Sequence, residues 1–593
     1  MNLPRLKEAT QVCIQGCCPN PTFNTAEPEP EPERERSTKS RSTTSSLCRQ
    51  NFAVVTKASF FPNTYFTNHE SIPSMQESYT QFVEAYPKYD ETARIDKIRA
   101  QEYSELDVSN HVCLDYTGVG LFSQSQVKSD ETKPSASSQT PVSDFPLFCL
   151  TFKSVNLKSQ LIHGGEGSEL ESAIKKRIMD FLKISQNDYY MVFTANRTSA
   201  FKLVAESYPF QSSRKLLTVY DHESEALEGM INVSEKRGAS VIAAEFKWPR
   251  MRIRSVKLQN MIVRKKTKKT NSGLFVFPLQ SRTTGVCYSY QWMTMAQEHG
   301  WHVLFDACSL GPKEMDSFGL SLFQPDFLVC SFYKIFGENP TGFGCLFVKK
   351  STAQILEDST GAGIVSIIPS KNLFSFVEDS SGTDTELEKI SKRWTEQDSV
   401  LQISEDNEIS KMECRCLDQV DSLGLMLISS RGRYLINWLV NSLMKLQHPN
   451  RLENFPLVTI YGPKVKFDRG QALAFNIHDW KGEKIDPILV QKLADRNNIS
   501  LSHGFLRHIW FPEKYEDDKH RIMSRNIKEK EATRIKNCKN EQEITVVTAA
   551  FTFLTNFKDA YNLWAFIARF LDADFVEKER WRYTALDQKT IEV

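Results

Sequence analysis

Short apolar runs alternate with helical patterns through the centre of the chain, roughly from residue 150 to residue 350. Strands separated by helices at this spacing are typical of βα units around a mostly parallel sheet. The pattern therefore predicts an α/β fold, in which helices sandwich a large, mostly parallel mixed sheet and a smaller α+β domain follows. The expected strands are Tyr190–Thr194, Lys215–Tyr220, Leu274–Pro278, His302–Asp306, Phe327–Ser331 and Gly344–Val348.

Polar stretches without periodicity divide the chain around this centre. The first 50 residues contain the run EPEPEPERERSTKSRSTTSS, which is too charged and too poor in apolar side chains to build a core. A similar stretch at Gln124–Asp144 predicts an inserted loop, and apolar residues at helical spacing predict one long helix over Leu417–Leu446. The expected units are a disordered arm at 1–50, an N-terminal segment with its loop at 51–150, the large domain at 151–377, a disordered acidic insertion at 378–411 and a small C-terminal domain at 412–593.

Charge and composition narrow the class of partner. The chain has 593 residues, 40% of them hydrophobic, and its 74 Lys and Arg against 73 Asp and Glu leave a formal charge of +1. A balanced charge provides no global field for nucleic acid or an anionic membrane, and the basic run Arg250–Lys269 has no interleaved aromatic residues. We therefore expect neither partner, and we interpret that run as a solvated helix and loop.

Cysteine usage bears on the compartment. The 13 cysteines are scattered from Cys13 to Cys538, an odd number without the spacing of a disulfide scaffold. The N-terminus lacks the apolar region of a secretory signal, and the longest apolar stretches are shorter than the roughly 20 residues that a bilayer demands. Cys13, Cys17 and Cys18 lack the spacing of metal ligands. We expect reduced thiols in the cytoplasm, with an organelle as the alternative, and neither a membrane segment nor a metal.

A turn of small and hydroxyl-bearing residues follows the first expected strand. It reads Thr194-Ala195-Asn196-Arg197-Thr198-Ser199 and stands where the strand gives way to a helical pattern. Backbone N–H groups at the start of a helix converge on anions, and the helix dipole favours negative charge there, so the turn predicts a phosphate seat. Ser, Thr and Asn also cap ordinary helices, and that interpretation stays open.

Asp306 and Lys334 follow two later strands. Asp306 closes the expected strand His302–Asp306, at the edge where ligands of open α/β sheets bind. A buried carboxylate there needs a cationic or N–H partner, which a protonated heterocyclic nitrogen or an arginine of the fold provides. Lys334 follows the strand Phe327–Ser331, where partial desolvation favours a neutral amine and Schiff-base formation, although most lysines at strand ends are solvated charges.

The three features together point to one cofactor. Pyridoxal phosphate requires a seat for its phosphate, a carboxylate for its pyridinium nitrogen and a lysine for its aldehyde. These features occur here in one expected domain, in the order phosphate turn, Asp306 and Lys334. The sequence therefore predicts a site for pyridoxal phosphate at this edge of the sheet.

The segments around these residues resemble a known family, the fold-type-I pyridoxal-phosphate enzymes of the class V aminotransferase group. Within that group they are most similar to the N-terminal, cysteine-desulfurase-like domain of molybdenum cofactor sulfurases, and in particular to plant-type single-domain relatives. The resemblance spans roughly residues 110 to 365 and implies the fold of type I pyridoxal-phosphate transferases. It is carried by VFTANRTSAFKLVAESYPF, YDHESEALEGM, LFVFPLQSRTTGVCYS, WHVLFDACSLGP and DFLVCSFYKIFGENPTGFGCLFVKK.

The resemblance implies a role for each matching residue. Lys334 would form the Schiff base, Asp306 would keep the ring nitrogen protonated, and the imidazole of His222 would stack on the ring. Lys334 and His222 would thus be the catalytic residues, although a lone histidine in a loop is also commonly a surface residue. The phosphate would be held around Ala195, Asn196, Thr198, Ser331 and Thr341.

Two departures from the family pattern change the expected activity. Family desulfurases carry a cysteine on a late mobile loop, and the matching stretch here, ISLSHGFLRH at 499–508, has none. Because a thiolate is the side chain suited to carry a persulfide, standard cysteine desulfurase activity is not expected unless Cys414 or Cys416 compensates. Arg507 is the candidate to replace the arginine that binds the substrate carboxylate. The chain also ends without the family's cofactor-sulfuration domain, so any sulfur transfer would need a separate sulfur-acceptor protein.

We therefore expect a transferase or lyase that depends on pyridoxal phosphate and acts on a small amino-acid substrate through Lys334. A homodimer is consistent with the family. The alternative is a catalytically degenerate scaffold or regulatory protein that keeps the fold. The missing loop cysteine favours this alternative, whereas Lys334, Asp306 and His222 oppose it.

Overall fold

The computed structural model describes most of the chain between residues 60 and 589. Within the described part, no helix is both long enough and apolar enough to cross a membrane. The expected arm at 1–50 and the acidic insertion at 378–411 lie outside the described residues, and the domain boundaries stay predictions. The described ranges are 60–104, 110–115, 148–165, 167–263, 273–308, 324–331, 343–359, 363–369, 415–449, 455–463, 469–519 and 543–589.

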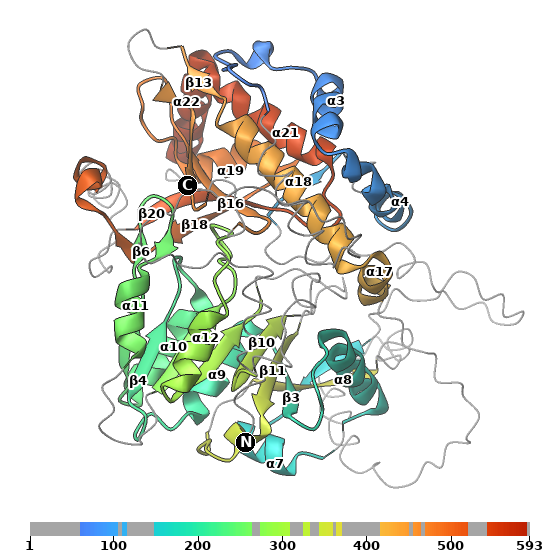
Figure 1. The fold of residues 1–593 in the computed structure, drawn as a ribbon, viewed down its shortest axis with the longest axis vertical. Helices are drawn as coiled ribbons and strands as arrows, with labels where there is room; N and C mark the ends of the chain where they lie inside the picture. Colours follow the sequence, from blue (N-terminus) through green and yellow to red (C-terminus); the bar gives the residue numbers. More distant parts are fainter. Residues whose placement is uncertain are drawn as a thin grey trace, which may run out of the picture.

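A nine-stranded sheet forms the centre of the lower body in Figure 1. Strands β11 and β12 are antiparallel to both of their neighbours. The strands from β10 through β9, β8 and β4 to β5 are all parallel to one another. This arrangement confirms the expected mostly parallel mixed sheet. In spatial order the strands are β2 (Phe148–Phe152), β12 (Ile364–Pro369), β3 (Tyr189–Thr194), β11 (Gly344–Lys349), β10 (Phe327–Ser331), β9 (Trp301–Asp306), β8 (Gly273–Pro278), β4 (Lys215–Thr218) and β5 (Ser240–Ala243).

The six strands expected from apolar runs are all present, and five of them match to within one residue at each end. The sixth, β4, ends at Thr218, two residues before the expected end at Tyr220, although the N–H of Val219 still donates to Val276 of β8. Three strands were not predicted. One of them, β5, is a sheet edge with partly exposed residues, so its sequence carries no continuous apolar run.

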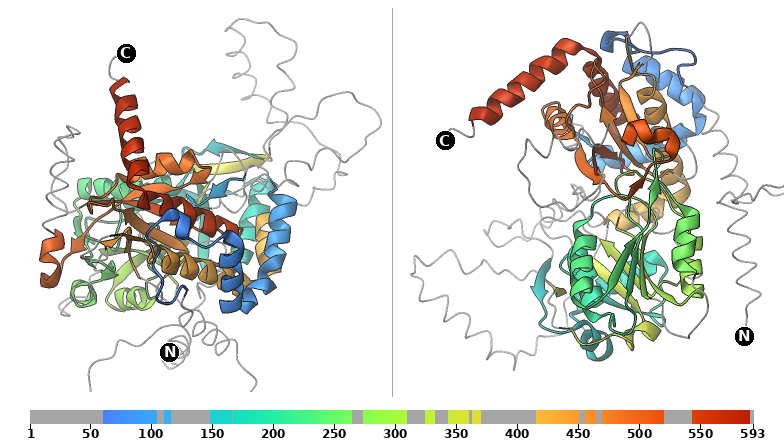
Figure 2. Two further views of the ribbon diagram at one scale, coloured as in Figure 1. Left: turned by 90° about the horizontal axis from the view of Figure 1, so that it is seen from above. Right: turned by 90° about the vertical axis from the view of Figure 1, so that its left-hand side faces the viewer.

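Helices cover both faces of this sheet, as the side view in Figure 2 shows. Successive residues of β9 point to opposite faces: Val303 and Phe305 join one apolar cluster and Leu304 joins the other. The first cluster lies under α8 (Glu169–Leu182), α11 (Ser255–Ile262) and α12 (Gln291–Glu298). The second lies under α7 (Leu157–His163), α9 (Arg197–Ser207) and α10 (Glu225–Lys236). Three layers therefore form, and the short helix α15 (Lys350–Ala353) follows β11.

A smaller α+β unit forms the upper body in Figure 1. Its antiparallel sheet has the order β15 (Val458–Tyr461), β16 (Ala472–Ile477), β20 (Ile544–Ala550) and β18 (Ser502–Leu506). Its helices are α17 (Arg415–Leu423), α18 (Leu425–Leu443), α19 (Pro487–Asp495), α21 (Phe557–Ala568) and α22 (Ala573–Lys589). The single long helix expected over Leu417–Leu446 is wrong. Gly424 has φ +78, which takes the backbone out of the helical region, and the segment forms α17 and α18 instead.

The N-terminal helices α3 (Met75–Ala85) and α4 (Ala93–Glu102) pack against the small unit. Phe82 of α3 lies in the same apolar cluster as Trp438 of α18 and Trp564 of α21. The buried guanidinium of Arg431 bonds to Asp96 and to the hydroxyl of Thr92, at 2.9 Å for each Nη1 contact. Apolar contact and charge together join residues 60–104 to the C-terminal part of the chain.

One of the short strand pairs outside the two large sheets connects the two bodies. Strand β19 (Ile509–Trp510) pairs with β6 (Phe246–Lys247), which also pairs with β7 (Arg252–Ile253). Within the small unit, β1 (Val112–Cys113) pairs with β17 (Ile499–Ser500). A further pair joins β13 (Gln447–His448) and β14 (Phe455–Pro456).

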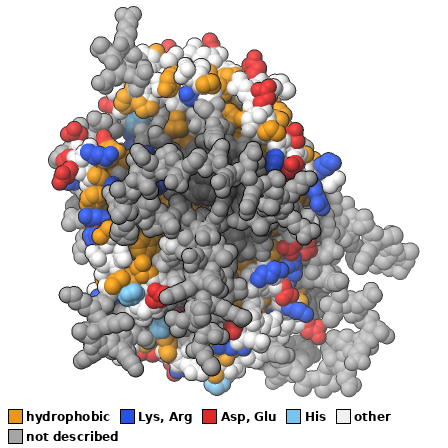
Figure 3. Space-filling view, in the orientation of Figure 1, with side chains coloured by type: hydrophobic (Ala, Val, Ile, Leu, Met, Phe, Trp, Pro, Cys, Tyr) orange, Lys and Arg blue, Asp and Glu red, His pale blue; other side chains and the backbone are white. Residues whose placement is uncertain are grey.

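Lys, Arg, Asp and Glu are interspersed over the described part of the face in Figure 3, in line with the balanced charge.

Candidate active site at the carboxyl edge of the large sheet

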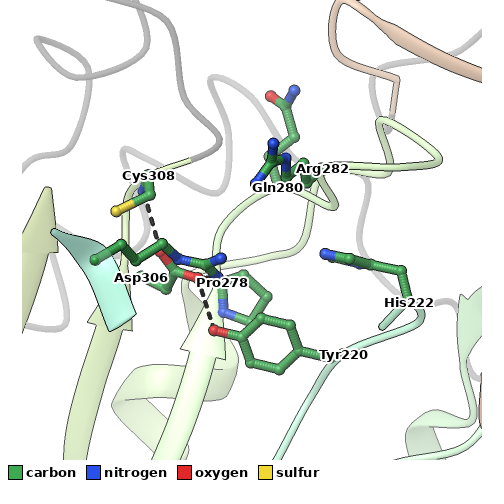
Figure 4. Close-up of a pocket in the computed structure, with 8 residues that line it drawn as sticks. Tyr220, His222, Pro278, Gln280, Arg282, Asp306 and Cys308 are labelled. Carbon is green, nitrogen blue, oxygen red and sulfur yellow. Dashed lines mark hydrogen bonds and ion pairs between the residues drawn. The ribbon is translucent and has the colours of Figure 1, made fainter. Parts of the chain in front are cut away.

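Four strands deliver side chains to one cavity at the edge of the large sheet. Arg197 follows β3, Tyr220 follows β4, Arg282 follows β8, and Asp306 ends β9. The cavity between these side chains has an empty volume of about 230 Å³, which includes the part open to solvent. Figure 4 shows several of the side chains around it. Carboxyl ends of parallel strands are where open α/β sheets bind ligands. The lining residues are Arg197, Tyr220, His222, Pro278, Gln280, Arg282, Asp306 and Cys308.

Asp306 is a buried carboxylate with an arginine partner. Its Oδ2 lies 2.5 Å from Nη2 of Arg197 and accepts the hydroxyl of Tyr220 at 2.7 Å, while Oδ1 accepts the N–H of Cys308 at 3.0 Å. Burial alone raises the pKa of Asp306, but the charge and hydrogen bond of Arg197 outweigh it and hold the pKa below its ordinary value. Of the two partners that the sequence left open, the described residues therefore provide the arginine.

Asp221 orients His222 from below the cavity. This fully buried carboxylate receives the Nδ1–H of His222 at 2.8 Å and the hydroxyls of Ser281 at 2.7 Å and Thr284 at 2.6 Å. These hydrogen bonds lower the pKa of Asp221 although burial opposes them. When Nδ1 donates to Asp221 and carries the only ring proton, Nε2 is an acceptor. Nε2 is buried without a partner among the described residues, and the ring points into the cavity in Figure 4.

The predicted phosphate turn is the N-terminus of α9. Asn196 caps the helix by accepting the N–H of Ser199 at 2.8 Å, and the N–H of Ala195 donates to Gly363 at 3.0 Å. The N–H groups of Arg197 and Thr198 have no acceptor among the described residues, as expected for the first positions of a helix. Asn196 therefore caps the helix, as the alternative interpretation predicted, and the N–H groups of Arg197 and Thr198 are left for an anion.

Ser331 lies close to this turn through the sheet register. Ser331 pairs with Gly344, and Gly344 pairs with Thr194 on its other side. A Cβ at position 344 would lie 2.5 Å from Oγ1 of Thr194, so the close approach of the strand to the turn requires a glycine. Six predicted site residues therefore share one edge of the sheet. They are Ala195, Asn196, Thr198, His222, Asp306 and Ser331.

Other predicted residues lie outside the described part of the chain. Lys334 and Thr341 fall between β10 and β11, in residues 332–342. Cys414 also lies outside, and Cys416 is described only as a backbone position of α17. The roles assigned to these residues stay predictions.

The stretch expected to match the family's mobile loop is built into sheets. Residues 502–506 form β18 and pair antiparallel with β20, while Leu506 forms a bridge with His222. Arg507, the expected binder of a substrate carboxylate, instead forms ion pairs with Glu223 at 2.8 Å, with Glu543 at 2.8 Å and with Glu228. With three carboxylates around its guanidinium, Arg507 is a structural link between α10, β20 and this stretch.

Sequence reasoning missed six lining residues: Arg197, Tyr220, Pro278, Gln280, Arg282 and Cys308. A signal existed for two of them. Arg197 is a large cation within a turn of small residues, and Arg282 interrupts the hydroxyl-rich segment Ser281–Thr284 directly after a predicted strand. Tyr220 and Cys308 carry no such signal. The hydroxyl of Tyr220 reaches Asp306 across the sheet, and the N–H of Cys308 donates to Asp306 from two residues along the chain.

Comparison with protein families and known proteins supports the same interpretation. Residues 154–382 match the family model of Aminotransferase class-V. This part of the chain is a class V aminotransferase domain. The match and the observed sheet confirm the fold class of type I pyridoxal-phosphate enzymes, and pyridoxal phosphate is the cofactor that the family indicates.

Similar curated proteins are molybdenum cofactor sulfurases. The human protein is 29% identical over 444 residues, which are 69% of this chain and 43% of that protein. The protein of Oryza sativa subsp. japonica is 24% identical over 532 residues, 81% of this chain and 58% of that protein. The chain thus spans about half the length of the curated relatives it matches.

Cysteine desulfurases are among the similar solved structures. The apo enzyme of Thermococcus onnurineus has a TM-score of 0.48 and 15% identity, and the match covers 82% of this chain and 98% of that chain. CsdA of Escherichia coli has a TM-score of 0.48 and 16% identity over 80% of this chain and 98% of that chain.

The side chains at this edge of the class V domain fit pyridoxal phosphate, although one residue would compete with the cofactor ring for Asp306. A carboxylate has about four acceptor positions, and described residues use three on Asp306, so one remains for a ring N–H. The unpartnered Nε2 of His222 and the two N–H groups of α9 add polar positions around the same cavity. Arg197 is the competitor, because it extends from the predicted phosphate seat to Asp306.

Proposed function

We propose that the class V domain binds pyridoxal phosphate at this edge and acts on an amino acid as a transferase or lyase. The observation that carries the proposal is the shared edge, on which Asp306, His222 and the N-terminus of α9 converge within residues that match the family. When bound, the cofactor supplies an electron sink for bonds to the Cα atom of the amino acid. The substrate and the reaction type are proposals, because the chain spans about half of its curated relatives.

In this proposal each residue has one task. Lys334 holds the aldehyde carbon of the cofactor, and Ala195, Asn196, Thr198, Ser331 and Thr341 surround its phosphate. Asp306 orients the ring through its remaining acceptor position, and the buried Nε2 of His222 accepts a proton or an N–H in the cavity. A homodimer and a separate sulfur-acceptor protein remain part of the proposal. Standard cysteine desulfuration does not, because the stretch at 499–508 has no cysteine.

Absorbance of the purified protein with added pyridoxal phosphate tests the proposal. We expect a visible band that survives dialysis in the wild type and disappears in Lys334→Ala, because dialysis removes a cofactor that lacks its covalent link. Lys236→Ala, an exposed lysine on α10, is the matched control and should keep the band. A wild-type protein that never acquires the band would refute the proposal.

A scaffold or regulatory protein is the second candidate function. It is favoured by the ion pair between Arg197 and Asp306, which already balances the charge of the carboxylate that the ring nitrogen would contact. The same spectrum separates the candidates: amino acids shift the band of an enzyme, whereas a scaffold shows no shift with any member of a panel of natural amino acids.

A further inference from the structure

Arg282 stands out among the arginines near the cavity because no described residue forms a hydrogen bond or ion pair with it. It follows β8, lines the cavity beside Pro278 and Gln280, and is exposed toward solvent. Arg197 is paired with Asp306, and Arg507 is paired with three glutamates. Within the described part of the chain, Arg282 has neither a hydrogen bond nor an ion pair. Its guanidinium is therefore available to a ligand.

The charges that line the cavity favour an anionic ligand at Arg282. The lining contains the cations Arg197 and Arg282 and the single carboxylate of Asp306, which Arg197 already balances. Surrounding protein desolvates the Arg282 guanidinium, although its outer part is exposed, and the like charge of Arg197 acts in the same direction, so both lower the pKa of Arg282. An anion would relieve this repulsion. The planar fork of a guanidinium matches a carboxylate with two parallel hydrogen bonds.

A second, independent feature indicates what else the ligand carries. His222 is 5% exposed, and its Nε2 faces the same cavity as an acceptor without a described partner. A buried acceptor requires a donor, since leaving it unpaired costs about 1–3 kcal/mol. The cavity therefore offers a donor fork for a carboxylate and an acceptor for an N–H, which are the two polar ends of an α-amino acid.

We propose that Arg282 binds the carboxylate of the amino acid that enters the class V domain, a role for which Arg507 was the candidate from sequence. This inference rests on the proposed function and adds the residue that selects amino acids over simple amines. Arg282 is a specificity-determining residue that touches the substrate away from the bond that reacts.

Two amines that differ by a carboxylate test the proposal. L-alanine and ethylamine share the amino group and the methyl carbon, so the ratio of their dissociation constants, taken from shifts of the cofactor absorbance, reports carboxylate binding alone. We expect the wild type to prefer alanine and Arg282→Gln to lose about tenfold to a hundredfold of that preference, the value of a charged hydrogen-bonded contact. Arg282→Lys keeps the positive charge but lacks the planar guanidinium, so it should keep part of the preference for alanine.

Two further measurements control this result. Arg250→Gln removes another exposed arginine, outside the cavity, and should leave the ratio unchanged. Comparing pyridoxal phosphate with pyridoxal in Arg282→Gln separates the two sources of an anion. If Arg282→Gln weakens binding of pyridoxal phosphate and not of pyridoxal, while the alanine preference persists, Arg282 binds the cofactor phosphate and the proposal is overturned. An unchanged alanine preference in Arg282→Gln overturns it in any case.

A measurement without the cofactor distinguishes failure of this inference from failure of the proposed function. Acetate at constant ionic strength should raise the melting temperature of the cofactor-free wild type relative to chloride, because a ligand of the folded state stabilises it. Arg282→Gln should lose this increment, and Arg250→Gln should keep it. If no cofactor band forms but the acetate increment depends on Arg282, the proposed function fails and the carboxylate site stands. If the increment is absent or survives Arg282→Gln, the site fails.

Discussion

Arg197→Ala should destabilise the cofactor-free protein by about 3–5 kcal/mol and should make its stability strongly dependent on pyridoxal phosphate. The side chains of Arg197 and Asp306 are 17% and 2% exposed, so removing the guanidinium leaves a buried carboxylate with no cation. The folded state then carries the free-energy cost of removing this carboxylate from water without the attraction of a cation. In Arg197→Ala, a protonated ring nitrogen of the cofactor would supply the positive charge that the guanidinium of Arg197 provides in the wild type.

Urea unfolding with and without pyridoxal phosphate measures this effect. The cofactor should raise the unfolding midpoint more in Arg197→Ala than in the wild type, since in the variant the ring nitrogen would replace the missing cation beside Asp306, whereas in the wild type Arg197 already balances this carboxylate. Arg197→Met keeps the apolar stem near Phe201 and removes the same charge, so it should behave like Arg197→Ala if charge is the cause. Combining Arg197→Met with Asp306→Asn should cost less than Arg197→Met alone. Equal cofactor-induced shifts in the variant and the wild type would show that the ring does not approach Asp306.

The same pair predicts how stability depends on acid. The folded-state pKa of Asp306 is below its unfolded value, because the charge of Arg197 outweighs the effect of burial. A lowered pKa contributes stability that is fully present above the unfolded value of about 3.9 and is lost as pH falls through the folded value. In Arg197→Ala, burial raises the pKa of Asp306 unopposed by this guanidinium, so the stability deficit of the variant should be largest near neutral pH and should shrink as acid protonates the carboxylate. Urea unfolding at several pH values measures this difference.

Asp221→Asn is the second change with a large expected effect, about 3 kcal/mol or more of stability. The carboxylate accepts three hydrogen bonds in a fully buried position, from His222, Ser281 and Thr284. An amide has one acceptor oxygen and places its NH₂ group against one of these donors. The loss should therefore exceed that of any one hydrogen bond. Urea unfolding at neutral pH measures it, and Asp418→Asn on the exposed face of α17 is a control that should change little.

Asp221→Asn should also change the cavity, beyond its effect on stability. Asp221 keeps the proton of His222 on Nδ1, and this leaves Nε2 as an acceptor toward the cavity. Without the carboxylate the tautomer is no longer selected, so binding of amines measured by cofactor absorbance should weaken in the folded variant. If folded Asp221→Asn binds L-alanine as the wild type does, then Asp221 is only a structural residue.

The sequence alone determined the elements whose signals are local. β3, β8, β9, β10 and β11 are apolar runs bounded by polar residues, and each matches its predicted range closely because a strand buried on both faces must be apolar along its whole length. The positions of Asp306, His222 and the turn before α9 at strand ends follow from the same runs. Motif resemblance then supplied the cofactor and the order of the site residues, including Lys334, which lies outside the described part of the chain.

Tertiary structure decided which charges meet. Arg197 and Asp306 are 109 positions apart. They meet because α9, which begins at Arg197, packs over β11 and β10, the strands between β3 and β9, in an order that the linear sequence does not contain. Arg507 stands near a site motif in sequence, but β18 and β20 bring Glu543 to its guanidinium, where Glu223 and Glu228 also lie. Arg282, by contrast, has no hydrogen bond or ion pair to another described residue. Electrostatic partners depend on distances across the fold, whereas apolar patterns along the chain record only the local backbone. This is why the sequence predicts which residues lie at the ends of the strands but not which of their charges are paired.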